Sequence, residues 1–325
     1  MSGYPVTKIR ALIADIGATH ARVAWVDQAL MYHDVVIHRS ADFNAPDEVI
    51  NAYCQAHGFE RPALILLAIA APVELDEVKF VNNHWQFKLS DVKAHLAPST
   101  VHFYNDVEML GAALPHLPES ALVKVGGGEL SPYAPKLAMS LGSGIGTSLV
   151  VHHHNWLAIP SEGGHSAMMM EDQEIVNFWQ MLRCSGKDEI IVEDFIAGRR
   201  GIPQLIDYMT KLLNVKHKDS SPMALVSGLI DKKDAFAVQL FSRYCAMIGG
   251  VAKNYTLITG AKSVYLAGGI IPRFLEFFVQ SDFRSAFEHS ASVFPLLQKI
   301  PTFVVTDPYP ALTGLVQTIA FMEDE

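Results

Sequence analysis

The sequence has few cysteines and no surplus of positive charge. Its three cysteines, Cys54, Cys184 and Cys245, lie far apart and form no CxxC pair. This argues against a disulfide framework and against a cysteine zinc site, and it suits a reducing compartment. Lys and Arg number 25 against 34 Asp and Glu, a net charge of −9. The chain therefore lacks the basic surplus that binds a nucleic-acid backbone, and we expect no nucleic-acid partner.

Long hydrophobic runs are also missing. The first residues contain no apolar segment of the kind found in a secretory leader, so we expect none. The longest apolar run, 63–72, is too short to cross a bilayer and predicts a buried strand. We expect a cytoplasmic protein without a membrane partner. Hydrophobic residues make up 50% of the chain and charged residues 18%, a composition that excludes a largely disordered protein.

The length of 325 residues is comfortable for two domains. Strand-like runs alternate with helical patterns, which predicts an α/β fold. Strands are expected at 9–14, 21–26, 63–71, 100–104, 137–141, 147–151, 263–267 and 302–306. Helices are expected at 46–57, 107–117, 174–182, 235–259, 270–278 and from about 312.

A turn of small residues connects the first two predicted strands. Gly17, Ala18 and Thr19 would let backbone N–H groups approach a phosphate closely. Asp15 precedes the turn and could hold Mg²⁺ through water, and Arg22 adds positive charge. An ordinary hairpin turn with a capping aspartate explains the same residues equally well.

A second glycine turn repeats this layout in the other half of the chain. Gly142, Ser143 and Gly144 again lie between two predicted strands, which indicates a weak internal duplication. Two such turns facing each other would clamp a polyphosphate. Gly268 and Gly269 end a later strand before a helix, where they permit close approach of a flat ring or a phosphate. Close packing of strand and helix is the alternative for that glycine pair.

Three further positions carry polar side chains suited to chemistry. Asp106, with Asn105, follows a buried strand, where a carboxylate could accept a proton from an attacking hydroxyl. An Asx helix cap explains this pair too, and is favoured without context. Glu162 and His165, separated by two glycines, suit recognition of vicinal hydroxyls, with a polar turn as the alternative. Glu193 is uninformative by itself.

Taken together, these motifs resemble the bacterial glucokinase family, hexokinase relatives within the actin-like ATPase superfamily. The resemblance covers nearly the whole chain in order. It implies a two-domain actin-like ATPase (ribonuclease H-like) fold, with an active-site cleft between a small and a large α/β domain. The small domain is expected at 1–110 plus about 302–325, and the large one at 111–301. The motifs that carry it are 15–22, 82–87, 103–117, 142–146, 160–165, 266–278 and 283–288.

The resemblance also implies an activity and roles for residues. It implies an ATP:hexose 6-phosphotransferase that converts D-glucose to glucose 6-phosphate with ATP and Mg²⁺, as a homodimer. Asp106 falls on the family's catalytic base. Glucose ligands fall on Asn105, Asp106, Glu162, His165 and Glu193. The ATP site falls on Asp15, Gly17, Ala18, Thr19, Arg22, Gly142, Ser143, Gly144, Gly268 and Gly269.

The chain departs from the family pattern at four places. Ala18 replaces a glycine, at a cost that depends on the sign of φ at that residue. Ser143 replaces a threonine and keeps the hydroxyl. Ala167 stands where an aspartate is usual. The turn 197–201, Ala-Gly-Arg-Arg-Gly, replaces Ser-Gly-Pro-Gly, which leaves its conformation and its nucleotide contacts open.

Three alternatives follow from these features. A kinase for a related hexose would carry the same motifs, since one hydroxyl's configuration changes a hydrogen bond and not a motif. A sugar kinase or repressor of the ROK type would bring a cysteine-rich zinc motif, or a DNA-binding segment before the first strand, and neither is present in this sequence. A non-catalytic sugar-sensing protein on the same fold is supported only by the altered turn at 197–201.

Overall fold

The computed structural model describes residues 9–80, 84–215, 221–230 and 234–324. It separates into two compact units, Met1–Leu117 with Pro308–Glu325 (unit 1) and Pro118–Asp307 (unit 2). The motif residues Asn82 and Asn83 lie outside the described residues.

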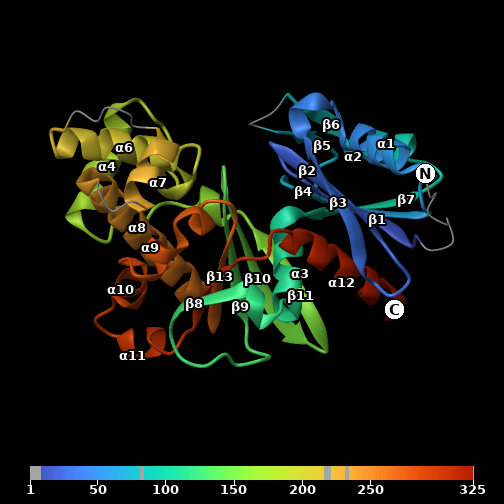
Figure 1. Ribbon diagram of the computed structural model, residues 1–325. Helices are drawn as coiled ribbons and strands as arrows, with labels where there is room; N and C mark the ends of the chain where they lie inside the picture. The colour runs from blue at the N-terminus through green and yellow to red at the C-terminus, as the bar shows by residue number, and fades with distance from the viewer. Residues whose placement is uncertain (1–8, 81–83, 216–220, 231–233, 325) are drawn as a thin grey trace. The chain divides into compact units, whose positions relative to one another are not determined.

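The main sheet of unit 1 has five strands in the order β3-β2-β1-β4-β7 (Figure 1). Strands β1, β2 and β3 are antiparallel neighbours, whereas β1, β4 and β7 run parallel. Continuous apolar sequence makes β1 and β4 the buried centre of this sheet. The strands are β1 (Ala11–Ile16), β2 (His20–Val26), β3 (Tyr32–Arg39), β4 (Leu64–Ile69) and β7 (Thr100–Asn105), with a separate hairpin of β5 (Glu77–Lys79) and β6 (Gln86–Lys88).

Helices cover both faces of this sheet. One apolar cluster joins the strands to α1, through side chains such as Val49, Ile50 and Tyr53. On the other face α12 packs along α3, with Leu312 and Leu315 buried (Figure 1). The helices are α1 (Pro46–His57), α2 (Leu89–His95), α3 (Asp106–Ala113) and α12 (Pro310–Asp324), with the 3₁₀ turns η2 (Ser40–Asp42) and η3 (Leu114–His116).

The sheet of unit 2 has six strands in the order β11-β10-β9-β12-β13-β8. Antiparallel strands β11, β10 and β9 continue into parallel strands β12 and β13, which repeats the strand arrangement of unit 1. The strands are β8 (Leu122–Gly126), β9 (Lys136–Leu141), β10 (Ile145–His153), β11 (Asn155–Ser161), β12 (Ser263–Ala267) and β13 (Thr302–Val305).

Strand β13 corrects one expected domain boundary. The sequence assigns residues from about 302 onward to the small domain. In the structure Val264 pairs with Thr302, and Leu266 pairs with Val304. Because these backbone pairs place β13 inside the sheet of unit 2, the chain returns to unit 1 only at Pro308.

The helix α8 (Ala235–Thr259) forms the centre of unit 2. Asp234 caps its first turn, and Gly260 ends it in the left-handed conformation at φ 72°. By length and composition it is apolar enough to cross a membrane, but 67% of its most apolar window is buried inside the protein. That burial is what a core helix shows.

Shorter helices surround α8. They are α4 (Gln173–Cys184), α5 (Glu193–Ile196), α6 (Gly201–Leu212), α7 (Pro222–Ile230), α9 (Leu275–Val279), α10 (Phe283–Glu288) and α11 (Phe294–Leu297), with the 3₁₀ turns η4 (Glu119–Ala121), η5 (Gly163–His165) and η6 (Ile271–Phe274).

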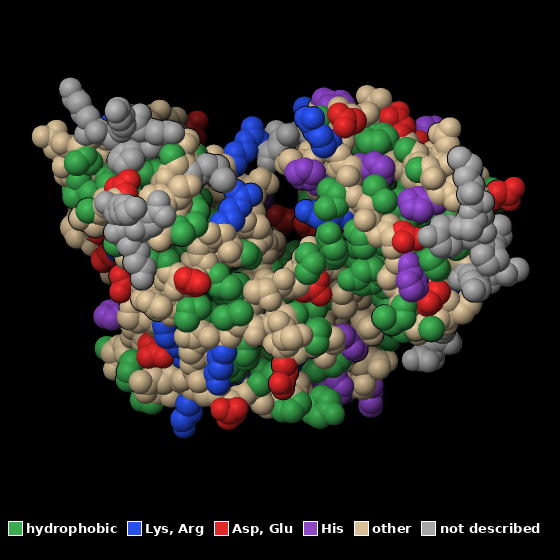
Figure 2. Space-filling model, viewed as in Figure 1, with side chains coloured by type: hydrophobic (Ala, Val, Ile, Leu, Met, Phe, Trp, Pro, Cys, Tyr) green, Lys and Arg blue, Asp and Glu red, His purple; other side chains and the backbone are tan. Residues whose placement is uncertain are grey.

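The charged side chains of the described residues are mixed in sign on the face drawn in Figure 2. Lys and Arg are interspersed with Asp and Glu, and apolar side chains lie between them. This distribution agrees with the low net charge density of the sequence.

Candidate functional site

The parallel strands of unit 1 bring two of the predicted motifs to one edge of the sheet. In the register, Ile16 of β1 lies opposite Ile69 of β4, which in turn lies opposite Asn105 of β7. Neighbouring strands are about 4.8 Å apart, so the ends of β1 and β7 are roughly 10 Å apart. The turn after β1 and Asp106 after β7 therefore share the carboxyl edge, where α/β sheets bind ligands.

An ion pair joins the two arms of the first hairpin. Asp15 lies opposite Arg22 in the register, and Arg22 Nη1 lies 2.9 Å from Asp15 Oδ2. Burial raises the pKa of the Asp15 carboxyl above its ordinary value, while the Arg22 guanidinium acts in the opposite direction. The pair keeps a carboxylate and a guanidinium together beside the predicted phosphate turn.

The turn after β1 (residues 17–19, the first phosphate turn) is unstrained. Gly17 N donates to His20 O at 3.1 Å. Ala18 does not have a positive φ, so its methyl group adds no left-handed strain. The alanine that departs from the family pattern is therefore compatible with this turn.

Ser40 supports the first phosphate turn through two hydrogen bonds. Its Oγ donates to Gly17 O at 2.7 Å, and its backbone N donates to Thr19 O at 3.0 Å. The serine is fully buried, and Trp85 Nε1 donates to its carbonyl at 2.9 Å. Both ends of the turn thus depend on one serine 23 residues beyond Gly17.

Asn105 caps α3, as the alternative interpretation of the sequence proposes. Its Oδ1 accepts from Val107 N at 3.0 Å and from Glu108 N at 3.4 Å, and its Nδ2 donates to Ala71 O at 3.2 Å. Glu108 makes the reciprocal hydrogen bond, in which its Oε2 accepts from Asn105 N at 3.3 Å. This reciprocal capping box fixes where the helix begins. One Nδ2 proton of Asn105 remains for a ligand.

Asp106 is the first residue of α3 and is half-buried. Its Oδ1 accepts from Val107 N at 2.9 Å. The N-terminal turn of a helix stabilises negative charge, so the position favours a carboxylate. Burial and the nearby Glu74 raise the pKa of the Glu108 carboxyl, two residues further on.

The second glycine turn (residues 142–144, the second phosphate turn) connects β9 to β10. Gly142 N donates to Gly144 O at 3.0 Å. A Cβ on Gly144 would lie 2.5 Å from Glu193 Oε1. A side chain there would therefore displace this carboxylate from its hydrogen bond with Ile145 N, whereas glycine lets the bond form.

Glu193 connects the second phosphate turn to the predicted sugar-binding residues. Its Oε1 accepts from Ile145 N at 2.8 Å. A Cβ on Gly164 would lie 3.1 Å from Glu193 Cγ and 2.4 Å from Ile145 O. The segments around 145, 164 and 193 thus meet within unit 2.

The altered turn 197–201 packs directly on the second phosphate turn. Gly198 N donates to Gly142 O at 2.9 Å, and Arg199 N donates to Ser143 O at 3.3 Å. A Cβ on Gly198 would lie 2.8 Å from Gly142 O. The replacement of serine and proline by two arginines therefore leaves a glycine where the backbones touch, and the turn still supports residues 142 and 143.

The predicted glycine pair lies beside the same turn. Ala267, the last residue of β12, pairs with Ser140 of β9. Gly268 has φ 97°, and a Cβ there would lie 2.2 Å from Leu141 O. Gly269 has no heavy atom within 4 Å of its Cβ position, so space is open there. Close packing explains Gly268, and open space at Gly269 suits approach of a ligand.

Residues 162–165 form the predicted sugar loop after β11. Glu162 Oε2 lies 2.9 Å from His165 Nδ1, and the two side chains are 63% and 58% exposed. The opposite edges of the pair, Glu162 Oε1 and His165 Nε2, have no hydrogen bond within the described part of the chain. The pair therefore presents an acceptor and a ring nitrogen to solvent, which suits hydroxyl groups.

Four residues that support these loops were not predicted. They are Ser40, Thr147, Gly198 and Tyr255. Thr147 Oγ1 accepts from Gly163 N at 3.2 Å. Gly198 lies in the turn 197–201, whose contacts the sequence left open, and the other three belong to none of the quoted motifs. The partners of all four lie far along the chain, so local sequence patterns give no signal for these contacts.

Asp15 is the residue predicted to hold Mg²⁺ through water. Asp15 Oδ2 faces Arg22, and no group of three or more potential metal-ligating side chains occurs among the described residues. A lone carboxylate fits an ion that keeps most of its waters and enters bound to phosphate oxygens. The residues present therefore fit Mg²⁺ carried by a nucleotide.

Comparison with known proteins assigns the chain a family. A family model described as Glucokinase matches residues 12–322. A glucokinase of Marinobacter nauticus is 31% identical over 316 residues, covering 96% of this chain and 98% of that protein. A glucokinase of Hahella chejuensis is 32% identical over 317 residues, with the same two coverages.

Solved structures share the fold. A glucokinase from an Antarctic psychrotroph is similar with a TM-score of 0.80 at 22% identity, covering 96% of this chain and 98% of that one. A Balamuthia mandrillaris glucokinase in complex with glucose is similar with a TM-score of 0.78 at 18% identity, covering 96% and 94%. These likenesses establish the two-domain actin-like fold. With the family match over nearly its whole length, the chain belongs to the glucokinase family.

Proposed function

We propose that this protein transfers the γ-phosphoryl group of ATP to the 6-hydroxyl of D-glucose, the first step of glycolysis. Membership of the glucokinase family supports this. The observation that carries it is the meeting, within unit 2, of the second phosphate turn and the sugar loop. Gly164 lies against Ile145 O, and Glu193 contacts both segments. A phosphate site adjoining a hydroxyl site is what phosphoryl transfer to a sugar needs.

Asp106 is the proposed base. Phosphoryl transfer needs positioning and charge neutralisation more than covalent chemistry by the protein. As the bond between O6 and the γ-phosphorus forms and the bond to the β-phosphate oxygen breaks, the Asp106 carboxylate accepts the proton of the 6-hydroxyl. Asn105, Glu162, His165 and Glu193 are the proposed sugar ligands.

The proposed phosphoryl donor is ATP with Mg²⁺. The two phosphate turns with Arg22 would bind its phosphates, and Gly268 with Gly269 would adjoin the adenosine. A ROK family glucokinase from Streptomyces griseus, solved with glucose and AMPPNP, supports an ATP-type donor on this fold. Mg²⁺ enters as part of the substrate, and Asp15 would hold it through water.

The oligomeric state, location and partners of the protein are also proposals. We expect a homodimer in the cytoplasm, with no nucleic-acid or membrane partner, and a kinase for a related hexose is the second candidate. The sugar-sensing alternative loses its only support, because the altered turn 197–201 keeps its backbone contacts with residues 142 and 143. ROK-type proteins match in fold at 14–16% identity, whereas the family match is to Glucokinase.

The test is ADP release by the purified protein with Mg²⁺–ATP and a panel of hexoses, with Asp106→Asn as the variant. We expect release that depends on glucose and falls by about 10²–10⁴-fold in the variant, the usual contribution of a positioned base. The variant should still bind glucose, because asparagine keeps the shape of the side chain.

Two results would contradict the proposal. Wild-type turnover in Asp106→Asn would remove the base from its role. Glucose binding without ADP release from any hexose would favour the sugar-sensing protein.

A further inference from the structure

The sugar loop is fixed through the carbonyl oxygen of Gly163. Tyr255 Oη donates a short hydrogen bond to this oxygen, and Ser166 Oγ donates to it at 2.7 Å. The two hydroxyls also lie 3.0 Å from each other. Gly163 follows Glu162 directly and precedes His165 by two residues, so this carbonyl lies between the proposed sugar ligands.

The other restraints on the loop come mainly from its backbone: His165 N donates to Glu162 O at 2.9 Å, Ser166 N donates to Gly163 O at 3.0 Å, and Gly164 packs against Ile145 O. Gly163 and Gly164 have no side chains to pack, and Glu162 and His165 are largely exposed and bonded to each other. On the opposite side of the loop, Gly163 N donates to Thr147 Oγ1. Hydrogen bonds to the loop backbone therefore replace the side-chain packing that would hold a loop of larger residues.

Tyr255 is itself firmly placed on α8. It is partly buried, its carbonyl accepts from Thr259 Oγ1 at 2.7 Å, and burial raises the pKa of its hydroxyl. The hydroxyl is thus a protonated donor throughout the neutral range.

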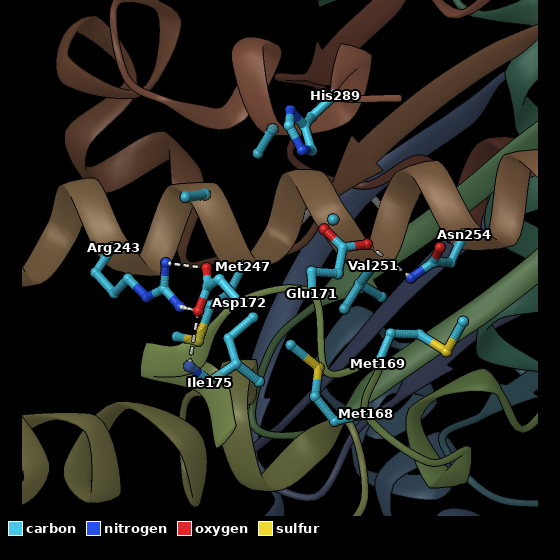
Figure 3. Close-up of a pocket in the computed structure, with 13 residues that line it drawn as sticks. Met168, Met169, Glu171, Asp172, Ile175, Arg243, Met247, Val251, Asn254 and His289 are labelled. Atoms are coloured by element: carbon cyan, nitrogen blue, oxygen red, sulfur yellow. Dashed lines mark hydrogen bonds and ion pairs between the residues drawn. The ribbon is translucent and has the colours of Figure 1, made fainter. Parts of the chain in front are cut away.

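The same helix holds the chain that follows the loop. Arg243 binds Asp172 through two nitrogens at 2.8 and 2.6 Å, and Lys253 Nζ lies 2.9 Å from Glu171 Oε1. Figure 3 shows Glu171 and Asp172 directed at α8, with Arg243 and Asn254 extending from that helix toward them. One helix thus fixes both ends of the stretch 163–172, and Tyr255 is its contact closest to the Glu162–His165 pair.

We propose that Tyr255 is a positioning residue for sugar binding. It acts through the Gly163 carbonyl to place Glu162 and His165, and it touches neither sugar nor nucleotide. The inference rests on the proposed function, because it takes residues 162–165 as the sugar site. Its consequence is selective: affinity for the hexose depends on the Tyr255 hydroxyl, and affinity for ATP does not.

The test is Tyr255→Phe, which removes only the hydroxyl. Loss of one hydrogen bond predicts a rise of about 3- to 10-fold in KM for glucose. The dissociation constant for glucose without ATP, measured by calorimetry, should rise by the same factor. The kcat at saturating glucose should stay within about twofold and KM for ATP should not change, since uniform sugar binding is what is lost.

Tyr208→Phe is the matched control. Tyr208 Oη also donates to a backbone carbonyl of unit 2, that of Glu174, at 3.3 Å, but it does not contact the sugar loop. This variant should lose comparable thermal stability and keep the wild-type KM for glucose. Ser166→Ala removes the second donor to Gly163 O and should raise KM for glucose in the same way, so the inference remains testable even if Tyr255→Phe does not fold.

The possible failures are distinguishable. A wild-type protein that neither binds nor phosphorylates a hexose overturns the proposed function and this inference with it. An active wild type with unchanged KM for glucose in Tyr255→Phe and Ser166→Ala overturns only the positioning role. An equal rise in KM for glucose and for ATP would mean a general loss of structure, and would also overturn it.

Discussion

Asn105 and Glu193 both accept hydrogen bonds from backbone amides of their own unit. Asn105 caps α3 through Val107 N, and Glu193 holds Ile145 N beside the second phosphate turn. A side chain fixed in this way loses little freedom when a ligand arrives, which lowers the entropic cost of binding. The structural contacts of these two residues therefore agree with the proposed roles as sugar ligands.

Ser40 offers a prediction at the residue scale. Ser40→Ala removes the hydrogen bond to Gly17 O while the backbone bond to Thr19 O remains. The first phosphate turn should then be less well placed. We expect KM for ATP to rise by about 3- to 10-fold, the effect of losing one hydrogen bond, with KM for glucose unchanged in steady-state kinetics.

Ser99→Ala is the control for this variant. Ser99 Oγ donates to Pro62 O at 2.7 Å, the same bond type and length, directly before β7 rather than beside the turn. It should lose similar stability and keep the wild-type KM for ATP. Equal kinetics in the two alanine variants would mean that Ser40 does not position the turn.

Some residues of the site can be predicted from neighbouring residues in the sequence, and others cannot. Asp15, the glycine turns, Asp106 and the Glu162–His165 pair stand out because each motif is contiguous in the sequence. Ser40 and Tyr255 do not, since they reach their partners across 23 and 92 residues of chain. Such contacts arise from the tertiary fold, and a serine or tyrosine within an ordinary helix or loop carries no pattern that indicates them.

At the scale of elements, strong local signals predict boundaries well and weak ones do not. The helix 46–57 is confirmed at both ends, because Pro46 suits the first turn and Gly58 adopts φ 68°. The helix expected over 270–278 is wrong as a single element. It divides into η6 and α9 at Phe274, which has φ −140°. The edge strands β3 and β11 are not predicted, because their apolar runs, 35–37 and 156–160, are short and their side chains are half-buried or exposed.

Two adjacent glycines in α8 provide a prediction at this scale. A Cβ on Gly249 would lie 2.3 Å from Phe283 O, a backbone atom of α10, whereas a Cβ on Gly250 would lie 2.9 Å from Glu171 Oε2, the end of a side chain. Gly249→Ala should therefore destabilise the protein by about 1–3 kcal/mol, because overpacking outweighs the gain in helix propensity.

Gly250→Ala is its matched comparison, since the helix gains the same propensity and the neighbour can move. Its free energy of unfolding, from urea titration, should fall less than that of Gly249→Ala. The packing argument would be wrong if the two variants lost equal stability, or if Gly249→Ala were the more stable.

At the scale of the molecule, the two sheets repeat one plan. In each, three antiparallel strands, including a hairpin with a glycine turn, continue into two parallel strands. In the sequence only the two glycine turns indicate this duplication. Elsewhere, equivalent positions of the two sheets need to be buried alike but do not need the same residue. The topology places each phosphate turn at the equivalent end of its sheet, so the duplication explains why the chain has two such turns.

Unit 2 contains a buried lysine, and the charge of this lysine makes the free energy of unfolding depend on pH. Lys136, at the start of β9, is 2% exposed. Its Nζ donates to Pro132 O at 2.8 Å and lies 4.3 Å from the centre of the Trp156 ring. No carboxylate of the described residues forms an ion pair with it. Burial lowers the pKa of Lys136 from 10.5 to about 8.

The sign of the effect follows from proton binding. Below pH 8 the lysine is charged in both states, and burial of that charge destabilises the folded one. Between about pH 8 and 10.5 the folded state loses this proton while the unfolded state keeps it, so the contribution of Lys136 to the free energy of unfolding rises with pH. At about 1.4 kcal/mol per pKa unit, the full gain is at most ~3.5 kcal/mol.

Lys136→Met, which keeps the length of the side chain without its charge, should remove this pH dependence. Between pH 7.5 and 9.5, below the range where buried tyrosines ionise, the chemical unfolding free energy of the variant should lose the contribution that rises with pH in the wild type. Lys124→Met, at a lysine that is 43% exposed on β8, should leave the wild-type slope unchanged. A wild-type slope retained in Lys136→Met would mean that another group sets the pH dependence, and that the Lys136 ammonium remains charged beneath the Trp156 ring.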